Sequence, residues 1–152
     1  IAATVAWLRT RADVAKDRLI LMGHCMGGRM TLLGAGRVPE FRAAVVYYGG
    51  GSHYPWGDEP NTPMDTLKNI RCPVIGFFGN EDTHPSPQNV NDIDAELTRH
   101  KVPHTFHRYD GVGHGFQGPA HTKPVERAAA EDSWAKTFRF LDSLGLAPAT
   151  VA

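Results

Sequence analysis

The sequence has 152 residues, enough for one domain with a sizeable core. Hydrophobic residues make up 41% and charged residues 21% of the chain, which is typical of globular proteins and excludes an intrinsically disordered one. Lys and Arg number 16, as do Asp and Glu, so no net charge favours nucleic acid or an anionic membrane, and no apolar run approaches the ~20 residues of a membrane span.

Hydrophobic periodicity divides the chain into alternating helices and strands. Val5, Leu8 and Ala12 recur at helical spacing, and the apolar run 43–48 is typical of a strand buried on both faces. This order of elements predicts a single α/β domain over 1–152, with a mostly parallel sheet between layers of helices and functional groups at the carboxyl ends of the strands. In chain order we expect helix 2–15, strand 19–22, helix 25–37, strand 41–48, a loop with one short helical turn over 52–69, strand 73–79, helix 87–100, strand 104–109, a glycine-rich loop over 110–122, helix 125–144 and a frayed tail over 145–152.

Four apolar residues repeat along the last and longest helix at three- to four-residue spacing. They are Ala130, Trp134, Phe138 and Leu141. Such a stripe is the pattern of a helix with one apolar face, so we expect these four side chains to pack on the sheet.

The segment 23–28, Gly-His-Cys-Met-Gly-Gly, lies between the first predicted strand and the second predicted helix. A tight turn at this place, with glycines two residues before and after a central residue, is the pattern of a nucleophile elbow. The turn strains the central residue, here Cys25, and lifts its side chain clear of the strand. We expect Gly23 and Gly27 to lack Cβ atoms so that strand and helix can approach closely. The N-terminus of the following helix favours negative charge, and therefore a thiolate.

Two later strand ends carry the groups that a thiol nucleophile needs. Asp82 follows the third strand and His114 follows the fourth, so nucleophile, acid and histidine occur in the chain order of α/β-hydrolases. His114 would take the proton of Cys25 and return it to the leaving group. Asp82 would hold the imidazole in one tautomer, and the backbone N–H of Met26 would be one donor to the oxyanion.

Each of these residues also has a simpler interpretation. Cys25 could be a small buried apolar side chain, and His114 could be an exposed loop residue. Asp82 could cap the helix that begins near Pro87, with Glu81 as an adjacent competitor for the role of the acid. Asp110 is better placed to shape the turn after the fourth strand than to serve as the acid.

The remaining histidines and the second cysteine do not predict a metal site or a disulfide. His104 and His107 lie on one predicted strand at an odd spacing, which puts them on opposite faces, and no Cys/His cluster has the spacing of zinc ligands. Cys25 ends one strand and Cys72 precedes another, so they would lie roughly 15–20 Å apart in a parallel sheet. That is too far for a disulfide. We therefore expect two free thiols, a reducing cytoplasmic compartment and no metal or organic cofactor.

Segments 23–28, 46–49, 71–82 and 113–116 are together similar to the dienelactone hydrolase (carboxymethylenebutenolidase) family of the α/β-hydrolase superfamily. The resemblance runs over almost the whole chain, and the cysteine in the elbow is its most specific mark. It implies a Cys-His-Asp triad of Cys25, His114 and Asp82 that hydrolyses an ester or lactone through an acyl-thioester.

The sequence differs from the founding members of this family in two respects. The chain would correspond to the C-terminal portion of the fold, without the earlier strands and the loop that gives a second oxyanion donor, so we expect residues 1–152 alone to have little activity. The founding enzymes carry an arginine four residues after the histidine to hold a substrate carboxylate. Here that residue is Gly118, so we expect a weaker preference for anionic lactones, for which Arg29 could compensate.

Two other functions fit the same residues. One is a general carboxylesterase or thioesterase with the same triad, and the other is a non-catalytic, flavodoxin-like module with Cys25 as a redox-sensing thiol. His114 discriminates between enzyme and sensor, because a sensor does not need it. The expected partner is a small-molecule ester or lactone, with no nucleic acid and no membrane, and the expected state is a monomer or weak dimer.

Overall fold

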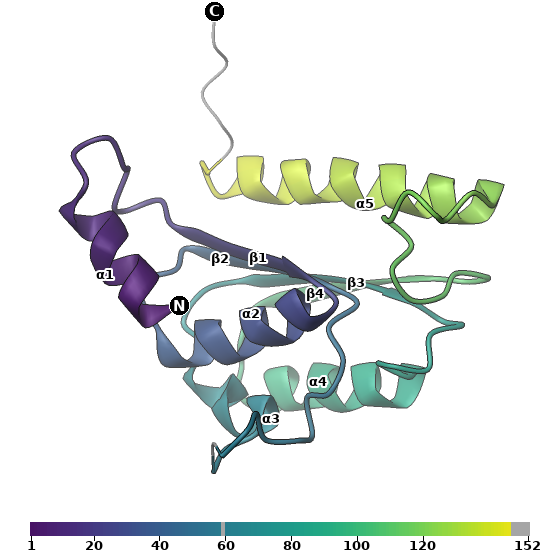
Figure 1. The fold of residues 1–152 in the computed structure, drawn as a ribbon, viewed down its shortest axis with the longest axis horizontal. Helices are drawn as coiled ribbons and strands as arrows, with labels where there is room; N and C mark the ends of the chain where they lie inside the picture. The colour runs from purple at the N-terminus through teal and green to yellow at the C-terminus, as the bar shows by residue number, and fades with distance from the viewer. Residues whose placement is uncertain (59, 147–152) are drawn as a thin grey trace, which may run out of the picture.

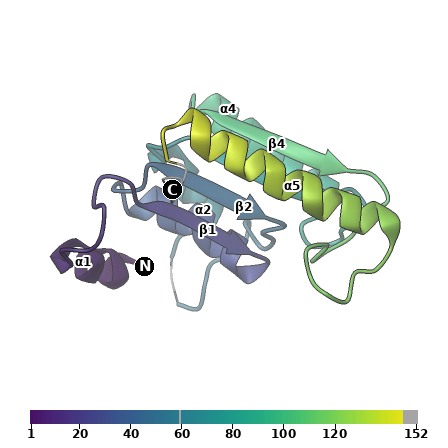
Figure 2. The ribbon, with the colours of Figure 1, turned by 90° about the horizontal axis from the view of Figure 1, so that it is seen from above.

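The computed structural model describes residues 1–58 and 60–146 and contains a parallel sheet in the order β1-β2-β3-β4. The strands are β1 (Ile20–His24), β2 (Ala43–Tyr47), β3 (Val74–Gly79) and β4 (His104–Tyr109). One face is covered by α2 (Met26–Arg37), α3 (Pro63–Thr66), a 3-10 turn (Leu67–Asn69) and α4 (Pro87–Arg99), and the other by α5 (Pro124–Ser143) (Figure 1). Helix α1 (Ala2–Thr10) lies beside the β1 edge (Figure 2). The predicted three-layer α/β fold is therefore confirmed.

The predicted bounds of most elements agree with the structure to within about two residues, but the first helix is shorter than expected. It ends at Thr10 because Arg11 is extended (φ −80°, ψ 137°) and its guanidinium pairs with Asp13 at 2.9 Å. Residues two apart do not face each other on a helix, so this pair favours the extended chain. The first strand instead runs further than predicted, to His24, because that residue pairs with Tyr47 of β2.

The two central strands are buried on both faces, as the apolar runs predicted, and separate two apolar clusters. Toward α2 and α4, residues Val46 and Phe78 pack with Leu32 and Ile93, whereas toward α5, Val45 and Phe77 pack with Leu141. Within the described residues β1 pairs only with β2, so it is an edge strand, and Met22 on it is 45% exposed.

The predicted buried face of α5 is wrong for its two aromatic residues. Trp134 and Phe138 are 36% and 53% exposed, and their rings stack on each other with centroids 5.9 Å apart. The helix is rotated because the hydroxyl groups of Tyr47 on β2 and Thr137 form a buried hydrogen bond of 2.6 Å. The side chains that α5 buries are Glu126, Ala129, Ser133, Thr137 and Leu141.

The end of α5 is ordered beyond the predicted start of the tail. Gly145 has φ +67°, its N–H donates to the carbonyl of Asp142 at 2.9 Å, and the Leu146 N–H donates to the carbonyl of Leu141 at 2.8 Å. These bonds form a Schellman motif, and Leu146 is buried. The prediction of a frayed tail is therefore wrong for 145–146, and residues 147–152 lie outside the described residues.

Candidate active site

The sharp turn predicted at Cys25 is present between β1 and α2. Cys25 has φ 55° and ψ −118°, a conformation that L-residues rarely adopt. Its N–H donates to the carbonyl of Tyr47 at 3.0 Å, and its carbonyl accepts from the N–H groups of Gly28 and Arg29 at 2.9 and 3.2 Å. These three bonds hold the strained backbone, and the thiol is exposed.

The glycines around Cys25 do not all act as predicted. A Cβ on Gly23 would lie 2.1 Å from the carbonyl oxygen of Gly27, so Gly23 is required for the close approach of strand and helix. A Cβ on Gly27 would meet nothing within 4 Å, and the expectation for Gly27 is therefore wrong. The second close approach is made by Gly28, where a Cβ would lie 2.7 Å from the carbonyl oxygen of Tyr47 and 2.9 Å from the Cα of Gly49. Gly28 faces the end of β2, whereas Gly27 faces open space.

The turn brings Cys25 into a chain of contacts with the two other predicted residues. The Sγ of Cys25 lies 3.0 Å from Nε2 of His114, and Nδ1 of His114 lies 2.7 Å from Oδ2 of Asp82. The other carboxylate oxygen accepts the His84 N–H at 2.7 Å. The Asp82 side chain is 1% exposed and that of His114 is 39% exposed. A carboxylate accepts at Nδ1–H, which leaves Nε2 to accept from the thiol.

The competing acids lie elsewhere. Glu81 is exposed, and Asp110 accepts a hydrogen bond from the Asn80 side chain at 2.5 Å, which links the loops after β3 and β4. Helix α4 is capped by Ser86 rather than by Asp82. Of the acids that the sequence left open, Asp82 is the one in contact with the imidazole of His114.

The histidines of β4 lie on opposite faces of the sheet, as their spacing predicted. His104 contacts Asp94 of α4, with Nε2 and Oδ1 3.3 Å apart. The His107 ring stacks on Phe77, with centroids 5.4 Å apart, and burial lowers its pKa. Within the described residues no group of three or more His, Cys, Asp or Glu side chains could hold a metal ion.

Both cysteines are free, as predicted, but their environments differ. Cys25 is exposed and Cys72 is buried just before β3. Burial raises the pKa of the Cys72 thiol to about 11, so Cys72 is a protonated thiol at neutral pH.

The sequence analysis did not identify Tyr48, which is in contact with the triad. Its φ is 39°, and its ring packs edge-on against the rings of His114 and Phe116, each with centroids 5.2 Å apart. Burial, followed by the charge of Cys25, raises the pKa of Tyr48 to about 12. Its position at the end of an apolar strand, just before three glycines, was the signal available in the sequence. A neutral Tyr48 therefore supports the edge of the imidazole.

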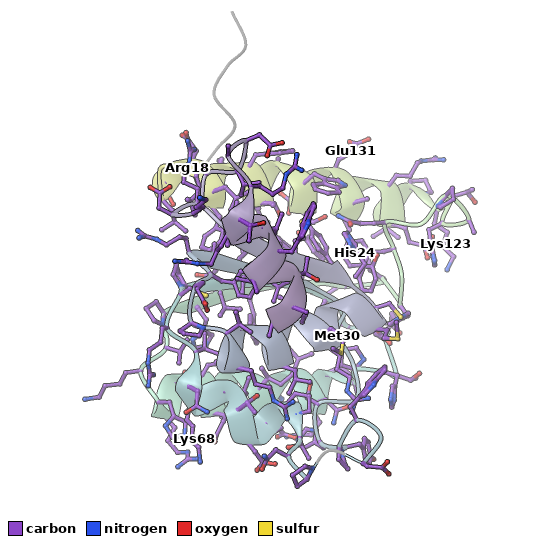
Figure 3. All side chains as sticks on the ribbon, turned by 60° about the vertical axis from the view of Figure 1, so that its left-hand side comes forward. Arg18, His24, Met30, Lys68, Lys123 and Glu131 are labelled. Carbon is purple, nitrogen blue, oxygen red and sulfur yellow. The ribbon has the colours of Figure 1, made fainter. Side chains whose placement is uncertain are left out.

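A second missed contact joins the elbow to the loop that carries His114. His24, labelled in Figure 3, donates through Nε2 to the side-chain carbonyl of Gln117 at 2.5 Å. The amide of Gln117 donates in turn to the Ser133 hydroxyl of α5 at 2.8 Å. The His24 ring also stacks on Tyr47, with centroids 4.3 Å apart and planes 7° apart. Gln117 is thus hydrogen-bonded to α5, and His24 is linked to the same helix through Gln117.

A cavity of about 400 Å³ opens at Cys25. Arg29 and Trp56 both line it, with Cζ of Arg29 4.9 Å from the centroid of the Trp56 ring, and Gly118, which the resemblance singled out, is not part of its lining. The lining is formed by Cys25, Met26, Arg29, Gly50, Gly51, Trp56, Asp82, Thr83, His84 and His114. Met26 begins α2, and its N–H is one of the first four of a helix, which have no partner within the helix.

Comparisons with known proteins agree on one family. The family model described as "Dienelactone hydrolase family" matches residues 1–145. A Synechocystis protein named "Putative carboxymethylenebutenolidase" is 34% identical over 90% of this chain and 54% of its own length. A Bradyrhizobium protein named "Probable 2-oxo-3-(5-oxofuran-2-ylidene)propanoate lactonase" is 29% identical over 93% of this chain and 56% of its own length.

The solved structures agree on the fold. The crystal structure of a Klebsiella pneumoniae protein named "Putative Dienelactone Hydrolase" superposes with a TM-score of 0.78 at 24% identity, covering 95% of this chain and 58% of that one. The chain spans about half the length of the curated relatives that it matches. Because the family model covers nearly the whole chain, this chain belongs to the dienelactone hydrolase family.

Proposed function

We propose that the protein hydrolyses an ester or lactone with Cys25 as the nucleophile, His114 as the general base and acid, and Asp82 as the group that orients His114. The observation that carries this proposal is the continuous chain of contacts from Sγ to Nε2 at 3.0 Å and from Nδ1 to the buried carboxylate at 2.7 Å. A thiol needs a base within hydrogen-bond reach and an orienting group behind that base, and both are present.

In the first half of the reaction, Nε2 of His114 takes the thiol proton and Sγ of Cys25 attacks the carbonyl carbon. The carbonyl π electrons move to oxygen, and the Met26 N–H at the N-terminus of α2 stabilises that oxyanion. The oxyanion then collapses, the C–O bond to the alcohol breaks, and the leaving oxygen takes the proton from His114. The product is an acyl-thioester on Cys25; in a lactone the alcohol stays attached to the acyl chain.

In the second half, His114 takes a proton from water, and the hydroxide attacks the thioester carbonyl. The C–S bond breaks, and Sγ recovers the proton from Nε2, which regenerates the thiol. Throughout, Asp82 stabilises the imidazolium without itself being protonated. No electrons are gained or lost, so the cycle needs water as its only co-substrate.

The relatives' names and the cavity support the proposed substrate class. Relatives are named as a carboxymethylenebutenolidase and a lactonase, and an opening of about 400 Å³ at Cys25 accommodates a small molecule. Carboxylesterase or thioesterase activity with the same triad is the second candidate.

The cytoplasmic location and the monomeric or weakly dimeric state stay predictions. The described helices include none that is both long enough and apolar enough to cross a membrane.

The proposal is tested in the full-length protein, because little activity is expected of residues 1–152 alone. The test variant is Cys25→Ala, and Cys72→Ala is the matched control. We expect Cys25→Ala to abolish hydrolysis of p-nitrophenyl acetate, and Cys72→Ala to keep it, because the buried Cys72 lies before β3, away from the cavity. Intact-mass spectrometry of the wild type during turnover should show one added acyl group, mapped to the peptide that contains Cys25. Undiminished turnover by Cys25→Ala would refute the assignment.

His114→Ala separates the enzyme from the redox-sensing thiol that the sequence left open. If Cys25 is a nucleophile activated by His114, this variant loses ester turnover and its alkylation by iodoacetamide slows. A sensor thiol would be alkylated at the same rate in both proteins, and neither would turn over ester. The contact of 3.0 Å between Sγ and Nε2 supports the first outcome.

A further inference from the structure

We infer that Arg29 is a positioning residue that holds the loop 51–56 as one wall of the substrate cavity, so that this wall offers the ring of Trp56 to a neutral part of the substrate. This inference rests on the proposed function, which makes the cavity at Cys25 the substrate cavity. Arg29 lies four residues after Cys25, in the first turns of α2, and both Arg29 and Trp56 line the cavity.

The guanidinium of Arg29 is engaged by the loop in two ways. Its Nη2 donates to the backbone carbonyls of Tyr54 and Pro55, the latter at 3.1 Å. Its Cζ lies 4.9 Å from the centroid of the Trp56 ring, within cation–π distance. Three successive loop residues therefore depend on one side chain.

The loop is shaped to admit this side chain. Gly51 has φ +70°, and a Cβ there would lie 3.1 Å from Nη1 and 3.3 Å from Cζ of Arg29, closer than ordinary contact. The turn is closed by the Tyr54 N–H, which donates to the Gly51 carbonyl at 3.3 Å, and the Met64 N–H donates to the Ser52 carbonyl at 3.2 Å. The glycine thus permits both the turn and the close approach of the guanidinium.

The same contacts argue against Arg29 as a holder of a substrate carboxylate. Nη2 is already committed to two carbonyls, and Nε is buried away from solvent with no hydrogen-bond partner. This leaves Nη1 as the nitrogen that a carboxylate could reach. The bidentate contact that arginine makes with carboxylates needs a second nitrogen, so a carboxylate would have to displace the loop from Nη2 or reach the buried Nε. Loop carbonyls and an aromatic face suit a guanidinium, whose planar fork a lysine ammonium cannot reproduce.

Arg29 also connects this wall to the elbow. Its N–H donates to the carbonyl of Cys25 at 3.2 Å, so the helix turn that begins at the nucleophile also carries the residue that fixes the loop. We call the contacts of Arg29 with the loop 51–56 the clamp. Loss of the clamp should loosen the wall that the substrate contacts while leaving His114 and Asp82 in place. The expected kinetic signature is a rise in KM with little change in kcat.

The test uses Arg29→Met and Arg29→Lys, with Arg99→Met on the exposed face of α4 as the matched control. The two substrates are p-nitrophenyl butyrate and p-nitrophenyl hemisuccinate, which differ chiefly by one carboxylate. We expect Arg29→Met to raise KM on the order of tenfold for both esters, as the loss of a hydrogen bond to a charged group implies. Arg29→Lys should show the same rise in KM, because a lysine cannot reproduce the contacts of the guanidinium. Trp56→Ala should also raise KM for both esters, and Arg99→Met should leave KM unchanged.

A KM increase confined to the hemisuccinate and reversed by Arg29→Lys would overturn the inference, because it would show a charge that binds the substrate. Unchanged KM for both esters would overturn it as well. Hydrogen exchange of the loop amides provides a readout without substrate: Tyr54 should exchange faster in Arg29→Met than in wild type, and equal rates would contradict the clamp. If the full-length wild type hydrolyses neither ester, the proposed function fails, whereas this exchange measurement still decides whether Arg29 holds the loop.

Discussion

Gly27 and Gly28 are neighbours in the first turn of α2, yet the structure predicts different effects when each is replaced by alanine. A Cβ on Gly28 would lie 2.7 Å from the carbonyl oxygen of Tyr47, and one on Gly27 would have nothing within 4 Å. The atoms that a Gly28 Cβ would meet belong to the backbone of β2 and of the residues after it, so no side chain can rotate away. The helix would have to move from the sheet by several tenths of an ångström.

The magnitude follows from two opposing contributions. Alanine in a helix is favoured over glycine by up to about 1 kcal/mol, a gain shared by both variants. Overpacking of this kind costs about 1–3 kcal/mol, and it applies to Gly28→Ala alone. The difference in the free energy of unfolding between the two variants should therefore be about 1–3 kcal/mol. In a chain of this length each kcal/mol shifts Tm by about 2–4 °C.

Thermal and urea unfolding of the two variants, followed by circular dichroism, checks this difference. Gly27→Ala should unfold at or above the wild-type midpoint, and Gly28→Ala below it. Equal midpoints for the two variants, or a lower midpoint for Gly27→Ala, would show that the helix and the strand do not approach as the structure has them. Because Gly28 donates to the Cys25 carbonyl, the alkylation rate of Cys25 should change in Gly28→Ala as well.

Three further predictions concern the residues around the triad. Iodoacetamide should label Cys25 and leave Cys72 unmodified in the folded protein, since burial raises the pKa of Cys72 to about 11; peptide mapping that finds Cys72 labelled first would contradict this. Gln117→Ala and His24→Ala should each lower kcat by roughly three- to tenfold, the worth of one hydrogen bond, and the double variant should lose little more than either alone. The pKa of Tyr48 is about 12 in the folded state against an ordinary value of 10.0, so its contribution to stability is complete below pH 10 and is lost between about pH 10 and 12; Tyr48→Phe should make the fall in stability over that range shallower in urea titrations, and an unchanged slope would contradict it.

Local patterns in the sequence were enough to predict the order of elements, the elbow and the positions at which polar groups follow the strands. These features are local: apolar periodicity sets each element, and a glycine turn between a strand and a helix sets the elbow. Parallel strands bring their carboxyl ends to one edge, so Cys25, Asp82 and His114 could be expected to meet before any contact was known. The resemblance to a known family selected Asp82 over its neighbour Glu81.

The buried faces of the helices could not be predicted from local patterns, because they depend on how the helices pack on the sheet. Trp134 and Phe138 have the spacing and apolar character of a buried stripe, yet Ser133 and Thr137 pack on the sheet in their place. The reason is that the buried hydroxyl of Tyr47 on β2 needs a hydrogen-bond partner, which Thr137 provides. A sequence pattern assigns polar residues to solvent, since the partner that satisfies them lies about ninety residues away in the chain, as Tyr47 and Thr137 do.

The same reason explains the details of the cavity. Gly27 and Gly28 are equivalent in a motif, and only the position of β2 distinguishes the one that must lack a Cβ. Arg29 could have faced solvent or substrate by its sequence, but the carbonyls that engage it belong to a loop 25 residues further along the chain. Contacts of this kind depend on which separate segments of the chain meet in space, and local sequence patterns do not specify this.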